Sequence, residues 1–278
     1  MPELPEVETM CRGLRPAIGQ RIVAVTRPRC RLQPIEMTPR LPTLRRRLTG
    51  RHIASIGRLG KRVLLVLDDD SRLVIEPRMS GLVLLRDPPD REHVRLVMGL
   101  SDGREIMFWN LRGLGVVRLL SAAEFADALG PDRIGPDALA VGAAELRARL
   151  GRGTRPIKVA LLDQRAVAGI GNLYASEILH RARIHPATPC RQLSARRWSR
   201  LHAALGEVLR DAIAHQGSTL RDGTYRIARD EPGDFQRRHR VYQRAAERCL
   251  QCGQRRIVRI IQAQRSTFFC PRCQRMPG

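Results

Sequence analysis

Four cysteines near the C-terminus constrain the fold more than any other feature of the sequence. Cys249 and Cys252 form one CxxC pair, Cys270 and Cys273 form a second, and 17 residues separate the two pairs. Four thiolates at this spacing are typical of a structural zinc site, in which a tetrahedral Zn²⁺ is fully coordinated and no position remains for water. The spacing therefore predicts one structural zinc ion.

The segment between the cysteine pairs is strand-like at 257–261 and again at 266–269, which predicts a β-hairpin zinc finger. A disulfide framework would require an oxidising compartment, and the acidic opening of the chain does not resemble a secretory signal. We therefore expect zinc. Cys11, Cys30 and Cys190 share no ligand spacing and are expected to be ordinary thiols.

The charge balance points to a polyanionic partner. The chain has 50 basic and 27 acidic residues, a formal net charge of +23, and such a field attracts nucleic acid before other partners. From residue 235 to the end, eleven arginines accompany one acidic residue, Glu247, so the finger is expected to grip phosphates. An anionic membrane surface is the weaker alternative, because we find neither a run of about 18 apolar residues nor a lysine-rich amphipathic helix.

The basic residues are almost all arginine. Only Lys61 and Lys158 are lysine. A lysine kept in such a chain indicates a position that needs a compact ammonium group, whose pKa can shift as that of a guanidinium cannot. Two lysines could also remain by chance, and composition leaves both interpretations open.

The first residues, Pro-Glu-Leu-Pro-Glu-Val-Glu-Thr from Pro2, admit two interpretations. If Met1 is removed, Pro2 offers a secondary amine at the chain terminus, and an α-amino group has a pKa of about 7.7–8.0. With Glu3 and Glu6 nearby to move protons, such an amine can attack a carbon centre and form a Schiff base. The alternative is that these residues only favour a helix N-terminus, through the helix dipole and the fixed φ of proline.

Periodicity predicts an α+β multidomain protein. A helix is expected over 3–18, with Gly19 at its end, and its apolar stripe comprises Leu4, Val7, Met10 or Cys11, Leu14 and Ile18. Short strands without intervening helices follow, which favours an antiparallel sandwich or barrel. The expected strands are 21–25, 51–56, 62–67, 73–75, 93–98, 105–108 and 116–120. The proline-rich stretch 27–42 is expected to be an irregular loop.

The pattern becomes helical after residue 144. Ser194 is expected to cap a helix whose apolar stripe is Trp198, Leu201, Leu205, Val208, Leu209 and Ile213, with Gly217 at its end. Gly169 and Gly171 precede another helical run, and backbone N–H groups at such a turn can bind an anion, although a glycine pattern alone is weak evidence. The stretch 219–235 has no clear period and is expected to be a long functional surface loop.

Taken in order, these segments resemble the family of bacterial formamidopyrimidine-DNA glycosylases, which excise 8-oxoguanine and ring-opened purines. The resemblance covers essentially the whole chain, and its motifs are specific as a set. They are residues 2–9, Lys61, Met79-Ser80-Gly81, His93-Val94, the run from Gly169 to Glu177, the run from Gln264 to Phe268 and the four cysteines.

The resemblance implies an N-terminal β-sandwich with an N-terminal helix, a helix–two-turn–helix domain and a C-terminal β-hairpin zinc finger. The domains expected on this basis are a catalytic sandwich at 2–130, a linker at 131–144, a DNA-binding helical domain at 145–240 and the finger at 241–278. Within the helical domain, 219–235 would cap the extruded base.

The resemblance also implies roles for single residues. Pro2 would attack C1′ of the damaged nucleoside, Glu3 would move protons at the deoxyribose, and Glu6 would help hold the site. Lys61 would assist elimination, and Arg265 would bind a phosphate and take part in the later elimination step.

Seven further residues are implied as DNA contacts. Met79 and Arg112 would fill the space left by the flipped nucleotide, and Leu114 would act as a wedge. Lys158 would lie near a phosphate, and Asn172 would hold one of the phosphates that flank the flipped nucleotide. The remaining two expected DNA contacts are His93 and Arg152.

The chain departs from the family pattern near two of these residues. Where the family commonly has Asp-Pro-Arg-Arg-Phe-Gly, residues 110–115 read Asn-Leu-Arg-Gly-Leu-Gly, so an arginine becomes Gly113 and an aromatic wedge becomes Leu114. Leucine still unstacks a base step but loses aromatic stacking, which bears on lesion search and opposite-base preference. Before Met79, Glu76 introduces an acid of unknown purpose.

The expected function is base-excision repair by a bifunctional glycosylase and abasic-site lyase that removes oxidised purines with β,δ-elimination. Two nearby alternatives are an endonuclease VIII-like enzyme for oxidised pyrimidines and an enzyme that is mainly an abasic-site lyase. A catalytically idle DNA-binding zinc-finger protein is the alternative from another class. We expect damaged double-stranded DNA as partner, no membrane, a monomer, and a bacterial cytoplasmic location in which DNA binding holds the protein at the nucleoid.

Overall fold

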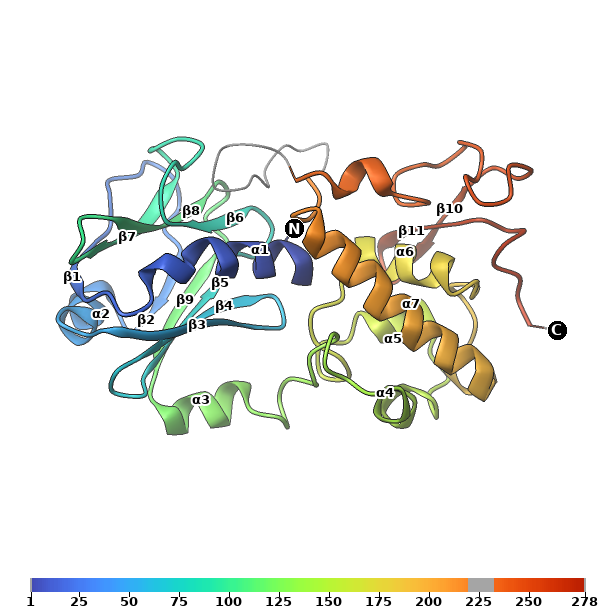
Figure 1. The fold of residues 1–278 in the computed structure, drawn as a ribbon, viewed down its shortest axis with the longest axis horizontal. Coiled ribbons are helices and arrows are strands. Elements are labelled where there is room, and N and C mark those ends of the chain that lie inside the picture. Colours follow the sequence, from blue (N-terminus) through green and yellow to red (C-terminus); the bar gives the residue numbers. More distant parts are fainter. Residues whose placement is uncertain (1, 220–232, 278) are drawn as a thin grey trace. The chain divides into compact units, whose positions relative to one another are not determined.

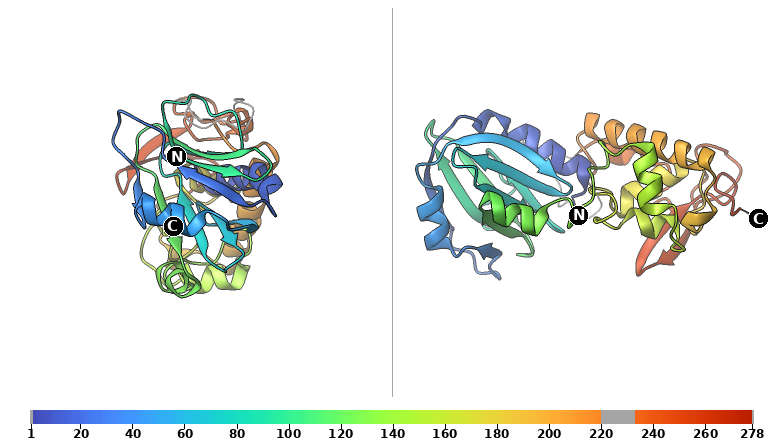
Figure 2. Two further views of the ribbon diagram at one scale, coloured as in Figure 1. Left: turned by 90° about the vertical axis from the view of Figure 1, so that its left-hand side faces the viewer. Right: turned by 90° about the horizontal axis from the view of Figure 1, so that it is seen from below.

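The computed structural model describes residues 2–219 and 233–277 and divides into two compact units. The first comprises 1–130 together with 215–236, and the second comprises 131–214 together with 237–278. Figures 1 and 2 show the β-rich first unit and the helical second unit. The sequence-based domain boundaries stay a prediction, and the structure adds that the segment after residue 214 groups with the first unit.

The first unit is a β-sandwich. Its two sheets have the strand orders β1-β7-β8-β6 and β2-β9-β5-β4-β3, and neighbouring strands are antiparallel except for the parallel pair β2 and β9. The strands are β1 (Ile22–Thr26), β2 (Glu36–Thr38), β3 (Ile53–Leu59), β4 (Arg62–Leu67), β5 (Arg72–Glu76), β6 (Gly81–Leu84), β7 (Val94–Leu100), β8 (Glu105–Asn110) and β9 (Val116–Leu120). The expected sandwich is confirmed.

Alternation of side chains builds the core between the sheets. In β4, Val63, Leu65 and Leu67 are buried, whereas the residues between them are only half-buried, as the two-residue period of a strand requires. The inward-facing residues of both sheets form one continuous apolar cluster. That cluster fixes the strands from which the functional loops project.

Two helices cover opposite edges of the sandwich. Helix α1 (Leu4–Leu14) packs against β3 of one sheet and β6 of the other, and α2 (Leu41–Leu48) packs against β1 and β2 (Figure 1). Because β3 and β6 are edge strands, α1 closes one open side of the core. Its amino-terminal end, and therefore Pro2, is held by this packing.

Three sequence-based expectations for this unit were wrong. The α-helix ends at Leu14, because Pro16 has no N–H to continue the hydrogen-bond ladder, and a 3-10 turn over Arg15–Ala17 leaves Ile18 42% exposed rather than in the core. The stretch expected to be a loop contains β2 and the start of α2. Strand β6 was not among the expected strands.

The second unit is helical and ends in a hairpin. Its helices are α4 (Ala143–Leu150), α5 (Ile157–Leu161), α6 (Asn172–Arg181) and α7 (Ala195–Ala214), and its strands are β10 (Val258–Gln262) and β11 (Arg265–Phe269). The expected stripe on α7 is buried except for the half-buried Val208. The turn before α4 is hydrogen-bonded to the turn before α6 through Gly135 N to Gln164 O and Ala138 N to Ala168 O. A further helix, α3 (Ala122–Leu129), belongs to the first unit.

Within the described ranges, no helix has both the length and the apolar character needed to span a membrane.

We expect Leu14→Ala to lower the free energy of unfolding by about 2–5 kcal/mol, because it leaves a cavity where α1 meets the sheets. Ile18→Ala is the control from the same segment and should change it by only about 0.5 kcal/mol, since Ile18 is largely exposed. Chemical denaturation measures both. Equal losses for the two variants would contradict this account of how α1 is anchored.

Candidate active site and metal centre

The amino-terminal segment of the chain is buried. Pro2 is buried and precedes α1, and the side chains of Glu3 and Glu6 are buried with it. The backbone N–H of Glu3 donates to Glu6 Oε2 at 2.8 Å, one half of the capping-box arrangement that begins the helix. The helix start is therefore real, and it places both carboxylates beside the terminal proline. The two interpretations of this stretch are compatible.

Glu6 also anchors the segment that follows α7. Its second oxygen, Oε1, accepts a hydrogen bond from the backbone N–H of Ser218 at 2.8 Å. Gly217 has φ +78°, and a Cβ there would lie 2.7 Å from the same oxygen, so only glycine fits. Sequence reasoning missed Ser218 and saw Gly217 only as a helix end.

The expected capping segment 219–235 lies mostly outside the described residues, which end at Thr219 and resume at Gly233. Its two ends are joined: Gly233 N donates to Thr219 Oγ1, Phe235 N to Gly217 O, and Asp234 N to His215 O. Glu6 thus joins the amino terminus to the base of this segment within one unit.

Lys61 lies at the turn between β3 and β4. Arg58, in the same hairpin, donates to Gly60 O at 3.0 Å and to Glu8 Oε2 on α1 at 3.3 Å. The Cys11 thiol donates to Gly57 O at 3.0 Å from the same helix. The hairpin that carries Lys61 is therefore tied to the helix that begins just after Pro2.

Met79 and Leu114 are large apolar side chains that remain 41% and 48% exposed in this unit. Buried Asn110 ties their loops together, since Nδ2 donates to Pro77 O at 3.0 Å and Oδ1 accepts from Leu114 N at 3.1 Å. Ser80 adds a second tie by accepting from the backbone N–H of Arg112 at 3.3 Å. Sequence reasoning missed Asn110, because its role depends on strands distant in the chain.

The structure supplies a physical reason for the glycine that replaces the family's arginine. Gly113 has φ +64°, and a Cβ there would lie 2.5 Å from the backbone oxygen of Gln33. An arginine at this position would be strained in its backbone and would collide with the neighbouring loop.

His93 is oriented by Asp90. Its Nδ1 lies 2.8 Å from Asp90 Oδ1, and the same oxygen accepts its backbone N–H. Burial works to raise the pKa of Asp90, but the donors of His93 outweigh it and hold that pKa below its usual range. The carboxylate thus fixes the imidazole, which also packs edge-on against Trp109.

The second unit brings three other predicted residues close to one another. Lys158 is fully buried, and its Nζ donates to Asn172 Oδ1 at 2.6 Å. Asn172 in turn donates through Nδ2 to Ser266 O at 2.9 Å, next to exposed Arg265 at the start of β11. The first residue of α6, the buried lysine and the finger hairpin are thus held together. Arg152 is exposed between α4 and α5 and is not one of the residues that these bonds join.

Gln164 shapes the glycine-containing turn before α6. Its Oε1 accepts from Gly169 N at 2.9 Å, and its Nε2 donates to Ile170 O at 2.9 Å. The turn ends where α6 begins at Asn172. The N-terminal N–H groups of that helix are suited to binding an anion, as the sequence indicated.

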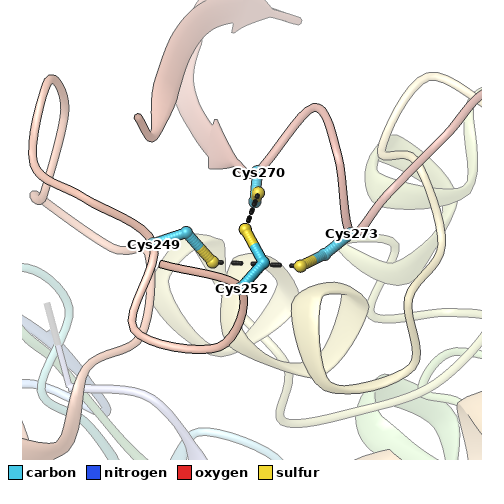
Figure 3. Close-up of side chains that lie close together, drawn as sticks. All are labelled: Cys249, Cys252, Cys270 and Cys273. Atoms are coloured by element: carbon cyan, nitrogen blue, oxygen red, sulfur yellow. Dashed lines mark hydrogen bonds between the residues drawn. The ribbon is translucent and has the colours of Figure 1, made fainter. Parts of the chain in front are cut away.

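The four cysteines of the finger converge. Their ligand atoms all lie within 4.8 Å of one another, and Figure 3 shows the sulfurs turned toward a common centre. Sγ–Sγ distances are 3.9 Å for Cys249 and Cys273 and 3.8 Å for Cys252 and Cys270. Tetrahedral Zn²⁺ with Zn–S bonds of about 2.3 Å requires edges of roughly 3.8 Å, so the donor set fits zinc.

The surroundings of the four thiols differ: burial raises the pKa of Cys270 and Cys273, whereas the pKa of Cys252 is lowered. Backbone N–H groups of Gln254 and Arg255 lower the pKa of Cys252 to about 6. A thiolate is the form that binds zinc. His180 of α6 places Nε2 3.7 Å from Cys249 Sγ, so the finger is packed against the helical part of its unit.

Glu177 provides the second anchor of the finger. Its carboxylate accepts backbone N–H groups of three consecutive residues, Arg240, Val241 and Tyr242, at 2.8–3.0 Å. The sequence presented Glu177 only as the end of a motif. The structure shows that it holds the segment leading into the finger.

Comparison with known proteins defines the class to which this fold and these sites belong. The chain matches models of the "Formamidopyrimidine-DNA glycosylase N-terminal domain" at residues 1–117, the "Formamidopyrimidine-DNA glycosylase H2TH domain" at 129–224 and the "Zinc finger found in FPG and IleRS" at 246–275. These are the parts of a helix–two-turn–helix DNA glycosylase with a zinc finger.

Full-length relatives identify the family. The chain is 43% identical to the formamidopyrimidine-DNA glycosylase of Chloroflexus aggregans, covering 99% of this chain and 98% of the relative, and 39% identical to that of Bacillus subtilis, covering 99% of each. The chain belongs to the formamidopyrimidine-DNA glycosylase family. The resemblance, the fold class and the structural zinc expected from the sequence are confirmed.

Solved structures agree with this assignment. The MutM (Fpg) protein of Thermus thermophilus matches with a TM-score of 0.86 and 37% identity, covering all of both chains. A Lactococcus lactis Fpg mutant in complex with Fapy-dG-containing DNA matches with a TM-score of 0.86 and 33% identity, covering 99% of this chain and all of the other.

We expect Gly113→Ala to destabilise the first unit more than Gly103→Ala does. Both glycines have positive φ, which costs an alanine about 1–2 kcal/mol, but a Cβ at Gly103 meets nothing within 4 Å. The collision with Gln33 should add about 1–3 kcal/mol at Gly113. Denaturant titration compares them, and equal losses would show that the contact with Gln33 does not determine the glycine.

Cys252→Ser is expected to release zinc and weaken duplex binding. The sandwich should stay folded, because the metal stabilises only the finger. Zinc is measured with a chromophoric chelator, and duplex affinity by fluorescence anisotropy. Cys30→Ser, outside the cluster, should retain both. Unchanged affinity after verified loss of zinc would contradict a DNA-binding role for the finger.

Proposed function

We propose that this chain is a bifunctional DNA glycosylase and abasic-site lyase that removes oxidised purines from duplex DNA, with Pro2 as the nucleophile. The observation that carries the proposal is the amino terminus: Pro2 is placed beside two buried carboxylates at the start of an anchored helix. The named relatives are formamidopyrimidine-DNA glycosylases, and Lactococcus lactis Fpg has been solved with DNA containing Fapy-dG and with DNA containing an abasic site.

The chemistry begins with the lone pair of the Pro2 amine, which forms a bond to C1′ of the damaged nucleoside. The bond from C1′ to the base breaks, and its electrons leave with the base, which takes up a proton. Opening of the sugar at O4′ gives a cationic iminium on the secondary amine. Glu3 supplies and removes protons at the deoxyribose, since its carboxylate is next to the amine in the chain.

Elimination follows from the positive charge of the iminium. Loss of a proton from C2′ expels the 3′ phosphate, and a second elimination expels the 5′ phosphate, after which water releases the enzyme. Lys61 and Arg265 assist these steps. Glu6 acts by position, because its two oxygens hold Glu3 N and Ser218 N.

Access to the base requires that the nucleotide leave the helix, at a cost of a few kcal/mol that is smallest for a damaged base. Met79 and Arg112 fill the vacated space, with Arg112 facing the partner base, and Leu114 acts as the wedge. The exposure of the two apolar side chains fits these roles. Phosphates on either side are held by Asn172 and Arg265. Lys158, whose buried Nζ donates to Asn172, lies near a phosphate. His93 and Arg152 contribute further DNA contacts.

The zinc site of the finger contributes binding rather than chemistry, and Arg265 is the one residue of the finger that is assigned a part in the elimination. When bound, zinc supplies the cross-link between the two cysteine pairs. The residues that hold it are Cys249, Cys252, Cys270 and Cys273, and four thiolates leave no coordination position for substrate.

The proposed enzyme works on DNA as a monomer in the bacterial nucleoid. The net charge of +23 suits a partner made of phosphates. The relatives cited above are bacterial.

Borohydride trapping tests the proposal. Protein shown by mass spectrometry to begin at Pro2 should form a covalent adduct with duplexes carrying 8-oxoguanine or an abasic site. It should form none with undamaged DNA. The matched control is the same chain with Met1 retained, in which the amine is displaced by one residue and trapping should be lost.

The set of duplexes separates the alternatives. Trapping on abasic DNA alone would leave only the lyase, and preferential trapping on an oxidised pyrimidine would favour the endonuclease VIII-like activity, for which the absence of an aromatic ring at Leu114 is the one supporting observation. No adduct with any duplex would leave only DNA binding.

A further inference from the structure

Glu76, the acid that the sequence left without a purpose, is a buried carboxylate bound by three arginines. It lies at the end of β5 and is 6% exposed. Its Oε1 accepts from Arg62 Nε at 2.8 Å and from Arg118 Nη2 at 2.6 Å, and its Oε2 lies 3.2 Å from Arg78 Nε. The mechanism proposed above uses none of these four residues.

Strand register brings three of the four together. Val63 of β4 pairs with Ile75 of β5, so the preceding Arg62 lies beside Glu76. On the other side, Glu76 pairs with Val116 of β9, and Arg118 is two residues further along the same face. Along each strand, the residues that alternate with these charged residues point into the sandwich core. The charged cluster therefore occupies the outer face of the five-stranded sheet.

The single negative charge of Glu76 is bound to the positive charges of three arginines. Burial works to raise the pKa of Glu76, but Arg62, Arg78 and Arg118 together outweigh it and keep that pKa below its usual range. The carboxylate is therefore ionised at neutral pH. Without it, three guanidinium groups would face one another in a partly buried place, where their repulsion is poorly screened.

Two of the three arginines adjoin residues of the proposed site. Arg62 directly follows Lys61 at the β3–β4 turn, and Arg78 directly precedes Met79. Arg78 also has φ +54°, a left-handed conformation that a non-glycine residue keeps only when its surroundings hold it. A single carboxylate thus connects the turn that carries Lys61 to the loop that carries Met79.

We propose that Glu76 is a positioning residue that fixes the Lys61 turn and the Met79 loop relative to each other. This inference rests on the proposed function. The ammonium group must reach the deoxyribose while Met79 occupies the space that the same nucleotide has left, so the two must keep a constant separation. Arg62 and Arg78 transmit the constraint, and Arg118 only completes the charge balance.

The test compares single-turnover excision of 8-oxoguanine by Glu76→Gln and Glu105→Gln. Both substitutions remove one negative charge from the sandwich. Glu105, however, is 42% exposed, and it pairs at 3.5 Å with Arg91, which is itself exposed. Glu76→Gln should slow excision about ten- to hundredfold, as expected for misplacement by about 1 Å. Affinity for undamaged duplex should match that of Glu105→Gln, whose excision should be unchanged.

Arginine variants keep the inference testable if Glu76→Gln does not fold. Arg62→Gln and Arg78→Gln each break one connection and leave the carboxylate compensated, so each should slow excision. Arg118→Gln removes the same kind of ion pair but adjoins neither functional residue, and it should slow excision less than either. Thermal unfolding of all variants separates loss of rate from loss of fold.

Two results would overturn the inference while leaving the proposed function intact: excision by Glu76→Gln equal to that of Glu105→Gln, or Arg118→Gln slower than both Arg62→Gln and Arg78→Gln. Absence of excision by the unchanged protein would refute the proposed function, and the inference with it.

Discussion

The site in the first unit depends on the packing of α1 against two edge strands. Burial of its apolar face between β3 and β6 fixes the position of the terminal proline, which has no covalent neighbour on one side once Met1 is removed. An amine on a free chain end would sample many orientations, whereas the catalysis proposed for Pro2 requires one. The buried Glu6 carboxylate adds direction, since it binds the start of α1 and the segment at Ser218 with its two oxygens. Hydrophobic burial thus fixes the position of the amino terminus, and the hydrogen-bonded carboxylate of Glu6 fixes its orientation.

Buried polar side chains also hold segments in place by hydrogen bonds elsewhere in the chain. Asn110 joins the two loops that expose Met79 and Leu114, and Glu177 holds the segment that enters the zinc finger. In each case a buried polar side chain satisfies backbone groups of a neighbouring loop. Loops that bind DNA cannot bury their side chains, so their order comes from such internal hydrogen bonds. The zinc ion serves this purpose for a finger that is too small for a large core.

The departures from the family pattern become interpretable in the structure. Gly113 is required by a left-handed turn against Gln33, which accounts for the absence of an arginine at this position. Leu114 keeps the exposed apolar character of a wedge without an aromatic ring. Glu76 balances three arginines, in a chain that uses arginine at 48 of its 50 basic positions. A sequence that has become rich in arginine must still neutralise those guanidiniums that are partly buried, and a carboxylate does so.

The sequence alone identified the family through the resemblance of its motifs. It also predicted the sandwich, a helical region, the zinc finger and most strands, because these elements follow from short-range spacing: CxxC pairs, alternation and helical period. The expected strands left out β6, and the expected helix ran past Pro16, so Ile18 was wrongly placed in the apolar stripe. The sequence could not find Asn110, Ser218 or the partners of Glu76, since those contacts join residues far apart in the chain through strand register and loop packing. Local patterns specify elements, whereas only the tertiary structure decides which polar groups meet.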